Sequence, residues 1–546
     1  MSKWNLLAVT VLAAVGSTAV AQKVTFETGT RLVMVDVAVR NGDNVTIPGL
    51  TKDDFVLKDK GKEREIQVFD IRESGVAPGA PTPMPPNVAS NRLNKEGQTM
   101  NSATVMLYDK INSTAQNQGY LREQLLKALS TMDENQYIGV YALDFNIEVV
   151  RDFNEPLGIL KQVAQQMRDG KSVDDLSTDE EKLLFAKLDN ALKPMQELAH
   201  QAKVNRTYPR FKSIARHIAG VPGAKNIIWL TSSFPLTFGT TRDKFKNDQA
   251  EVQNFLNVLT NYNISIFPVD PRGTGAALNT TETTGTDATI LNSGAADSAT
   301  LTPAGNSLNP NPGGIAMTNQ SDSLSGWSTM ELLGLKTGGK DYRNRNDIAP
   351  VIGDVVAATK VIYTLGFYAD KKDLDDKVHD LKVELKGDVP KGTKPYYRQE
   401  FVAYKLDSKA EQEQVPDMGT IIADPLSTSD IGLLGVSNPD PNKPGAQKVD
   451  VRVTLSDLTF ERRGDHYVGQ FALGMAVEGV EGGLAKNYPM DLTEAQFQQA
   501  MTSGVDLSNS IETKEGTGGF IRVAVQDKLT GRSGVIRVPY QVPAAE

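Results

Sequence analysis

Between residues 101 and 405, short continuous apolar runs alternate with segments of helical period. Strands that are buried on both faces have sequences of this kind. The runs lie at 105–108, 138–143, 227–230, 264–267 and 361–365. Between them, two sets of apolar residues share a helical face: Leu121, Leu125, Leu126 and Leu129, then Val252, Phe255, Leu256 and Leu259. This alternation predicts an α/β fold, with a doubly wound, mostly parallel sheet and helices on both faces.

The regions on either side of this α/β segment are β-rich. Residues 22–73 contain short β-rich runs bounded by Gly, Asp or Lys, which predicts a small β module. A Pro-rich stretch at 74–100 is typical of an extended linker. A second Pro-containing linker at 406–446 leads to alternating apolar residues at 447–546, which predict a C-terminal β-sandwich. Within the α/β segment, residues 273–325 are rich in Thr, Gly, Asn and Ser, and we expect a low-complexity surface insertion there.

The N-terminal residues have the features of a secretory signal peptide. Lys3 precedes an apolar run at 6–15, and small residues end at Ala21. The run is shorter than the roughly 20 residues that cross a bilayer. We therefore expect residues 1–21 to be a signal peptide, with an uncleaved anchor as the alternative, and the chain to be periplasmic, secreted or on the cell surface. No later segment predicts a membrane span in the mature chain.

Composition excludes several classes of protein. The chain has no cysteine, which rules out disulfides, thiol catalysis and zinc-thiolate sites. Its formal net charge of -9 argues against nucleic acid as a partner. The four histidines form no HExxH pair, and there is no Gly-x-Ser-x-Gly nucleophile motif. We therefore expect a protein that is not an enzyme.

One stretch matches a nucleotide-binding motif in part. Residues 334–340 have the spacing of a phosphate-binding P-loop up to its lysine, but Asp341 stands where the motif needs Ser or Thr for magnesium. A strand should precede the motif, whereas residues 328–335 predict a short helix. Residues 337–339 are better explained as the end of that helix. We reject the nucleotide site.

The residues that directly follow the apolar runs are candidates for a site, because ligands of open α/β sheets bind at the carboxyl ends of the strands. Asp109, Asn112 and Ser113 follow the first run, and Ser232 follows the run at 227–230. We expect these four residues to form a weak binding site. Asp109 and Ser113 could also ligate Mg²⁺ or Ca²⁺ weakly, and no other cofactor is expected. The alternative for Asp109 is structural: it would cap the following helix or accept backbone N–H groups.

This pattern resembles the von Willebrand factor A family, whose metal-ion-dependent adhesion site begins with Asp-x-Ser-x-Ser. Asp109 and Ser113 match the first and last positions of that motif. Ile111 stands at its middle serine, and Ser232 stands where the family has a later aspartate. The resemblance therefore implies a degenerate metal site, with Asp109 and Ser113 as the remaining ligands.

The resemblance extends from Thr30 to Tyr404 and is to the VWFA-related domain family described from acidobacteria. Ser172 and Thr207 are candidates for the threonine ligand that the motif takes from another loop. The matching stretches are 30–37, 49–55, 218–230, 268–273 and 363–368. The resemblance implies an exported protein with this fold, and it implies no activity.

Together these features predict an exported, non-enzymatic protein that binds another protein or a surface polymer. A structural scaffold of the cell envelope, with no ligand site, is the alternative. A hydrolase is the least favoured interpretation, because no catalytic motif supports it.

Overall fold

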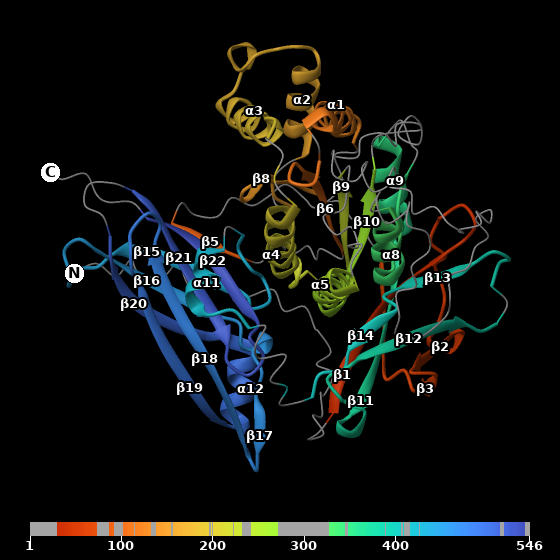
Figure 1. The fold of residues 1–546 in the computed structure, drawn as a ribbon. Helices are drawn as coiled ribbons and strands as arrows, with labels where there is room; N and C mark the ends of the chain where they lie inside the picture. Colours follow the sequence, from red (N-terminus) through yellow and green to blue (C-terminus); the bar gives the residue numbers. More distant parts are fainter. Residues whose placement is uncertain are drawn as a thin grey trace.

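The computed structural model describes three packed units, shown in Figure 1. It describes residues 30–73, 87–91, 102–113, 115–132, 138–153, 157–195, 198, 200–221, 223–231, 242–270, 327–343, 348–387, 389–405, 408, 415–424, 426–513 and 518–540. The expected signal peptide at 1–21 and the expected insertion at 273–325 lie outside these residues. The protein is a mixed α/β protein with several sheets.

The central unit contains a five-stranded sheet in the order β10-β9-β6-β7-β8. Its strands are β6 (Ser102–Asp109), β7 (Ile138–Leu143), β8 (Ile147–Arg151), β9 (Ala224–Leu230) and β10 (Ile264–Val269). Strands β6, β7, β9 and β10 are parallel, and β8 pairs with β7 in the antiparallel direction. The sheet is therefore mixed, and four of the five predicted apolar runs are confirmed as its parallel strands.

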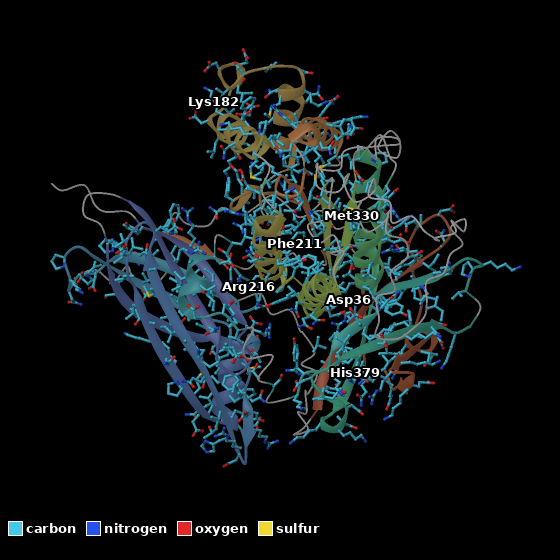
Figure 2. The ribbon with its side chains drawn as sticks, in the orientation of Figure 1. Asp36, Lys182, Phe211, Arg216, Met330 and His379 are labelled. Atoms are coloured by element: carbon cyan, nitrogen blue, oxygen red, sulfur yellow. The ribbon has the colours of Figure 1, made fainter. Side chains whose placement is uncertain are left out.

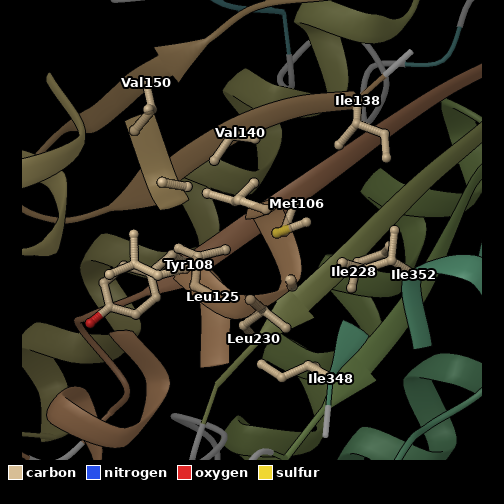
Figure 3. Close-up of a cluster of buried hydrophobic side chains, with 14 of the residues drawn as sticks. Met106, Tyr108, Leu125, Ile138, Val140, Val150, Ile228, Leu230, Ile348 and Ile352 are labelled. Atoms are coloured by element: carbon tan, nitrogen blue, oxygen red, sulfur yellow. The ribbon is translucent and has the colours of Figure 1, made fainter. Parts of the chain in front are cut away.

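Helices cover both faces of this sheet. One face carries α1 (Ala115–Thr131), α2 (Leu157–Arg168), α3 (Asp179–Leu192) and α9 (Ala349–Ala358); the other carries α4 (His200–Ile218), α5 (Arg242–Asn261) and α8 (Trp327–Thr337). Neighbouring residues of a strand point to opposite faces. Met106 and Tyr108 thus pack with Leu125 and Ile352 on the first face, as Figure 3 shows, while Leu107 packs in the other core. Burial on both faces explains the continuous apolar runs.

The N-terminal unit is a β-sandwich built from two distant parts of the sequence. One sheet has the order β13-β1-β11-β4 and the other β14-β12-β2-β3. The strands are β1 (Thr30–Arg40), β2 (Phe55–Asp59), β3 (Lys62–Arg64), β4 (Val68–Glu73), β11 (Val361–Asp370), β12 (Val378–Leu385), β13 (Lys394–Tyr397) and β14 (Glu400–Val402). Short 3-10 turns lie at Lys52–Asp54 and Lys371–Asp373. The module expected at 22–73 is therefore completed by residues 361–402.

This pairing corrects the prediction for the run at 361–365. The run forms part of β11, which pairs antiparallel with β1 and β4 and does not join the parallel sheet. Leu365 lies in the core of the sandwich, whereas Ile362 packs against Ala224 of the central unit. Because β11 is covered on both faces, its sequence has the same continuous apolar pattern as a central strand. The structural unit of the α/β sheet accordingly ends before residue 361, and not at 405.

The C-terminal unit is a second β-sandwich. Its sheets have the orders β20-β16-β15-β5 and β17-β18-β21-β22, with β19 paired to β18. The strands are β5 (Val88–Ser90), β15 (Leu433–Pro439), β16 (Ala446–Val453), β17 (Glu461–Arg463), β18 (His466–Val477), β19 (Leu484–Thr493), β20 (Val505–Glu512), β21 (Gly519–Asp527) and β22 (Ser533–Tyr540). Helices α11 (Met418–Ala423) and α12 (Glu494–Ser503) and a 3-10 turn at Leu455–Asp457 complete it.

Both expected linkers contribute to this C-terminal unit. Strand β5 lies within 74–100 and pairs with β15, which itself lies within 406–446. After β4 the chain therefore adds one strand to the C-terminal sandwich and then forms the central unit. It returns to the N-terminal sandwich with β11–β14 and completes the C-terminal sandwich from β15 onward. No helix among the described residues is both long and apolar enough for a membrane span.

Candidate binding site at the carboxyl ends of the strands

Asp109 is the last residue of β6, and its side chain is fully buried. Its Oδ1 accepts the backbone N–H of Asn112 at 3.0 Å. Its Oδ2 accepts the side-chain amide of Asn112 at 2.7 Å and the indole Nε1–H of Trp229 at 2.8 Å. The side chain of Thr231 is a further donor. Burial raises the pKa of Asp109, and these hydrogen bonds act against that rise.

Asn112 connects this carboxylate to α4. Its Nδ2 also donates to Oγ1 of Thr207 at 3.0 Å, and that hydroxyl donates to the carbonyl of Lys203 at 2.8 Å. Thr207, one of the two threonine-position candidates, therefore lies in the same buried cluster as Asp109. Ser172, the other candidate, is exposed and bonds to Asp175 at the 3-10 turn Val173–Asp175. The structure brings Thr207 to the site and not Ser172.

Ser113 is buried in a loop that Gln118 holds in place. The side-chain amide of Gln118 donates to the carbonyls of Ser113 at 3.1 Å and Lys110 at 3.3 Å. It also donates to the carbonyl of Met195 at 3.1 Å, and its Oε1 accepts the Met195 N–H at 2.8 Å. Ile111 is 1% exposed and belongs to the hydrophobic core. The loop that should supply metal ligands is therefore packed and hydrogen-bonded on several sides.

The carboxylate that would hold a cation is used within the protein. Both oxygens of Asp109 accept hydrogen bonds, so a metal ion would have to displace Asn112 or Trp229. Within the described ranges, no three or more His, Asp and Glu side chains are grouped so that they could hold a metal ion. Ser232 lies outside those ranges; the described chain stops at Thr231 before it. The arrangement fits the structural alternative for Asp109, in which it accepts hydrogen bonds from its surroundings.

Two donors of this cluster, Trp229 and Thr231, are absent from the predicted site. Trp229 is in β9, directly beside Leu107 of the central strand β6. A buried tryptophan usually needs a partner for its indole N–H. The tryptophan in the apolar run at 227–230 was therefore a signal that a buried acceptor lies nearby, and Asp109 two residues beyond Leu107 is that acceptor.

A second polar cluster lies at the amino end of the sheet, where α4 meets the C-terminal unit. Nη2 of Arg216 contacts Oδ2 of Asp424 at 2.6 Å, with side chains that are 8% and 2% exposed. Ser213 donates to the same oxygen at 2.8 Å. Figure 2 marks Arg216 on α4. A buried ion pair with a supporting hydroxyl thus joins the central unit to the segment that precedes the C-terminal sandwich.

His217 lies beside this ion pair and contacts acceptors with both ring nitrogens. Its Nδ1 faces the carbonyl of Ser427, and its Nε2 lies 3.3 Å from Oδ1 of Asp152. Burial lowers the pKa of His217, but Asp152 and the Ser427 carbonyl outweigh burial and leave the pKa raised. Burial likewise opposes ionisation of Asp152, yet His217, Phe153 and Tyr141 lower its pKa to about 2. The geometry therefore favours an imidazolium that donates on both sides.

Comparisons with known proteins give no family assignment. No protein-family model and no curated protein matches the chain. Similar solved structures include an aerotolerance-related membrane protein from Bacteroides fragilis, which is 10% identical in sequence. The alignment covers 47% of this chain and 98% of that protein, with a TM-score of 0.24. They also include a von Willebrand factor type A protein from Catenulispora acidiphila, with 9% identity, 94% and 75% coverage and a TM-score of 0.23. A superoxide reductase from Archaeoglobus fulgidus matches at 13% identity, 20% and 89% coverage and a TM-score of 0.14. At these TM-scores the similarities carry no argument about function.

Proposed function

We propose that this chain is an exported, non-enzymatic binding protein that recognises a protein or a surface polymer without a metal ion. The observation that carries the proposal is the burial and hydrogen bonding of the Asp109 side chain. Its carboxylate is fully buried and accepts hydrogen bonds from Asn112, Trp229 and Thr231. A metal-dependent adhesion site needs an acid whose oxygens face the ligand. Recognition would therefore use the outer surface of the protein.

We further propose that the central unit is a doubly wound domain of the von Willebrand factor A type. The parallel order β10-β9-β6-β7, with helices on both faces, supports this assignment. The resemblance of residues 30–404 to the VWFA-related family points the same way. In this proposal the antiparallel edge strand β8 is an addition to the doubly wound sheet.

A structural scaffold of the envelope is a second candidate, and the contacts between units favour it. Arg216 and Asp424 join the central unit to the C-terminal side, as described above. On the N-terminal side, Arg398 donates to the carbonyls of Thr260 in the central unit and Met34 in the sandwich. Three units connected by buried polar contacts form a stiff body, which is what a spacer or scaffold requires.

Hydrolysis receives little support from the two buried histidines, His217 and His379. Both ring nitrogens of His217 face acceptors, and His379 likewise contacts Asp59 at 2.7 Å and Asp375 at 3.0 Å. A general base needs a ring nitrogen that can take a proton from the substrate or water. In these two buried histidines each nitrogen is already occupied by a structural partner.

The proposal is tested by comparing capture with and without divalent cations. The purified chain is immobilised and incubated with envelope extract in EDTA or in excess Mg²⁺, and the same partner should be recovered from both. Asp109→Asn serves as the matched variant and should retain that partner if it folds. Recovery in Mg²⁺ alone, lost in Asp109→Asn, would show metal-dependent binding. No partner under either condition would favour the scaffold, and turnover of esterase, peptidase or glycosidase substrates would favour an enzyme.

Export needs a separate test. The proposal places the chain outside the cytoplasm, with its mature N-terminus at Gln22. Cell fractionation followed by mass spectrometry of the N-terminal peptide measures both properties. A full-length cytoplasmic product would contradict the proposal.

A further inference from the structure

A small cavity lies between the N-terminal sandwich and the amino end of the central sheet. Its volume is about 20 Å³, and its lining includes the side chains of Asp36, Arg40, Lys225 and Arg398. Arg40 and Asp36 belong to β1, while Lys225 belongs to β9 of the central unit. Figure 2 marks Asp36, which bonds to Asn263 just beyond the end of α5. A cavity of this size holds a single water molecule or a small ion.

The basic side chains at this cavity are bound to neutral carbonyl groups. Arg40 donates from Nε to Ala358 at 2.9 Å and from Nη2 to Gly338 at 3.5 Å, while its Nη1 is buried without a partner. Arg398 donates through both Nη atoms to backbone carbonyls, and its Nε is buried without a partner. Nζ of Lys225 has a carbonyl at 3.5 Å. None of these contacts neutralises a positive charge.

The one carboxylate of the lining is also occupied by neutral groups. Oδ1 of Asp36 accepts the hydroxyl of Thr364 at 2.6 Å, and Oδ2 accepts the amide of Asn263. Three basic side chains, Arg40, Lys225 and Arg398, thus outnumber the two acids that act on them, Asp36 of the lining and Asp430, which attracts Lys225. Arg40, Lys225 and Arg398 are 1%, 8% and 8% exposed. Buried charge without a counter-charge is costly, so this arrangement favours an anion in the cavity.

The pKa values of the three basic groups are lowered, as expected where buried positive charge is not fully compensated. Burial lowers the pKa of Arg40 to about 10, and it lowers the pKa of Arg398 to about 10 as well. It also lowers the pKa of Lys225, although Asp36 and Asp430 oppose the change. In each case desolvation exceeds the attraction of the neighbouring groups, which are Tyr396 and Tyr342 for Arg40 and Asp36 for Arg398. A bound anion would supply the missing attraction.

We propose that this cavity binds one monatomic anion, chloride, between Arg40, Lys225 and Arg398. A volume of about 20 Å³ suits one small ion. The ion would connect the N-terminal sandwich to the central unit, since Arg40 and Arg398 come from the former and Lys225 from the latter. The site is independent of the proposed function, because it does not involve the carboxyl-end cluster around Asp109.

The test is thermal unfolding of the purified chain in sodium chloride and in sodium gluconate at equal ionic strength. A ligand that binds the folded state raises the unfolding midpoint. Chloride should produce a saturable rise on the order of 2 °C over gluconate. The Lys225→Met variant should lose this rise, because it removes one cation and keeps a side chain of similar length. Lys448→Met is the control: Lys448 is 47% exposed on β16, and the variant should keep the rise.

A direct readout keeps the proposal testable if Lys225→Met does not fold. Crystals of the unsubstituted protein grown in sodium bromide should show an anomalous peak in the cavity beside Arg40 and Arg398. Equal midpoints in chloride and gluconate, together with no bromide peak, would overturn the proposal and assign the cavity to water. A chloride effect that Lys225→Met retains, with bromide bound elsewhere, would overturn it as well.

Discussion

The buried polar contacts at the two ends of the central sheet connect different parts of the molecule. At the carboxyl end, the buried carboxyl group of Asp109 accepts hydrogen bonds from Asn112, Trp229 and Thr231, and Lys110 beside it pairs with Asp144 of the same unit. At the amino end, ionic contacts such as that of Arg216 with Asp424 join the central unit to its neighbours. The end at which ligands usually bind in open α/β sheets is thus tied together internally, and the other end holds the protein's units in place.

The largest effect should come from breaking the ion pair at the amino end. Asp424→Ala leaves Arg216 and Ser213 without their acceptor, and Arg216 is 7% exposed. Removing one partner of a buried pair typically costs about 3–5 kcal/mol, because the other charge stays buried. Urea-induced unfolding, followed by circular dichroism, measures the loss in the free energy of unfolding.

An exposed ion pair provides the matched control for this variant. Arg452 contacts Asp506 at 2.7 Å, with side chains that are 43% and 67% exposed. Arg452→Ala should cost less than about 1 kcal/mol, because water screens such pairs. Equal losses for Asp424→Ala and Arg452→Ala would mean that the amino-end contact does not hold the units together.

A somewhat smaller effect is expected at the carboxyl end. Asp109→Asn should reduce the free energy of unfolding by about 2–3 kcal/mol, because it replaces an acceptor of several hydrogen bonds with an amide that must face the Trp229 and Asn112 donors. Trp229→Phe removes one of those donors. In a double-mutant cycle with Trp229→Phe, the two substitutions should couple by more than about 0.5 kcal/mol. Additive losses would contradict a direct bond between the two side chains.

The pH dependence of stability should report on His217. Its pKa is raised above the ordinary 6.5 by Asp152 and the Ser427 carbonyl, against the effect of burial. A raised pKa contributes stability below pH 6.5, and that contribution is lost as pH rises through the folded-state pKa. Asp424 and Tyr141 also face this side chain.

The measurement is the unfolding free energy between pH 6.5 and 9, for the unsubstituted chain and for His217→Gln. The unsubstituted chain should lose stability as pH rises, and the variant should lose less. Asp430, whose pKa burial raises to about 6, completes its ionisation in the lower part of this window, and both proteins retain it. Identical slopes for the two proteins would mean that His217 is not an imidazolium in the folded state.

The smallest effect separates the two candidates for the threonine position. Ser172→Ala removes an exposed cap of a 3-10 turn and should cost under about 1 kcal/mol. Thr207→Val removes the fully buried hydroxyl that accepts from Asn112 and should cost more, about 1–3 kcal/mol. Chemical denaturation of both variants checks the order, and a larger loss for Ser172→Ala would reverse the assignment.

Much of the fold follows from periodicity in the sequence. The runs at 105–108, 138–143, 227–230 and 264–267 predicted β6, β7, β9 and β10, and the helical faces predicted α1 and α5. The structure confirms the helix predicted in place of a P-loop, and its end. Gly334 lies within α8, and Gly338, directly after the helix, has φ of 82°. Periodicity reports burial and cannot report which sheet a strand joins. That is why β11, buried between two units, was assigned to the wrong sheet.

The hydrogen-bond partners of the predicted site residues could be read from the sequence only in part. The prediction brought Asp109, Asn112 and Ser113 together; in the structure Asp109 ends β6, and Asn112 and Ser113 are buried in the loop that follows it. It did not include Trp229, because an indole inside an apolar run is usually taken for core. Whether a donor on a neighbouring strand comes close to Asp109 depends on the register of the two strands. That register is set by packing across the whole sheet.

We infer that the Asp109 carboxylate serves the fold and not a divalent cation. Differential scanning calorimetry of the purified chain in EDTA and in excess Mg²⁺, Mn²⁺ or Ca²⁺ tests it most directly, since a ligand that binds only the native state raises the midpoint. We predict the same midpoint in all four solutions. A rise with one of these cations that disappears in Asp109→Asn would contradict the claim.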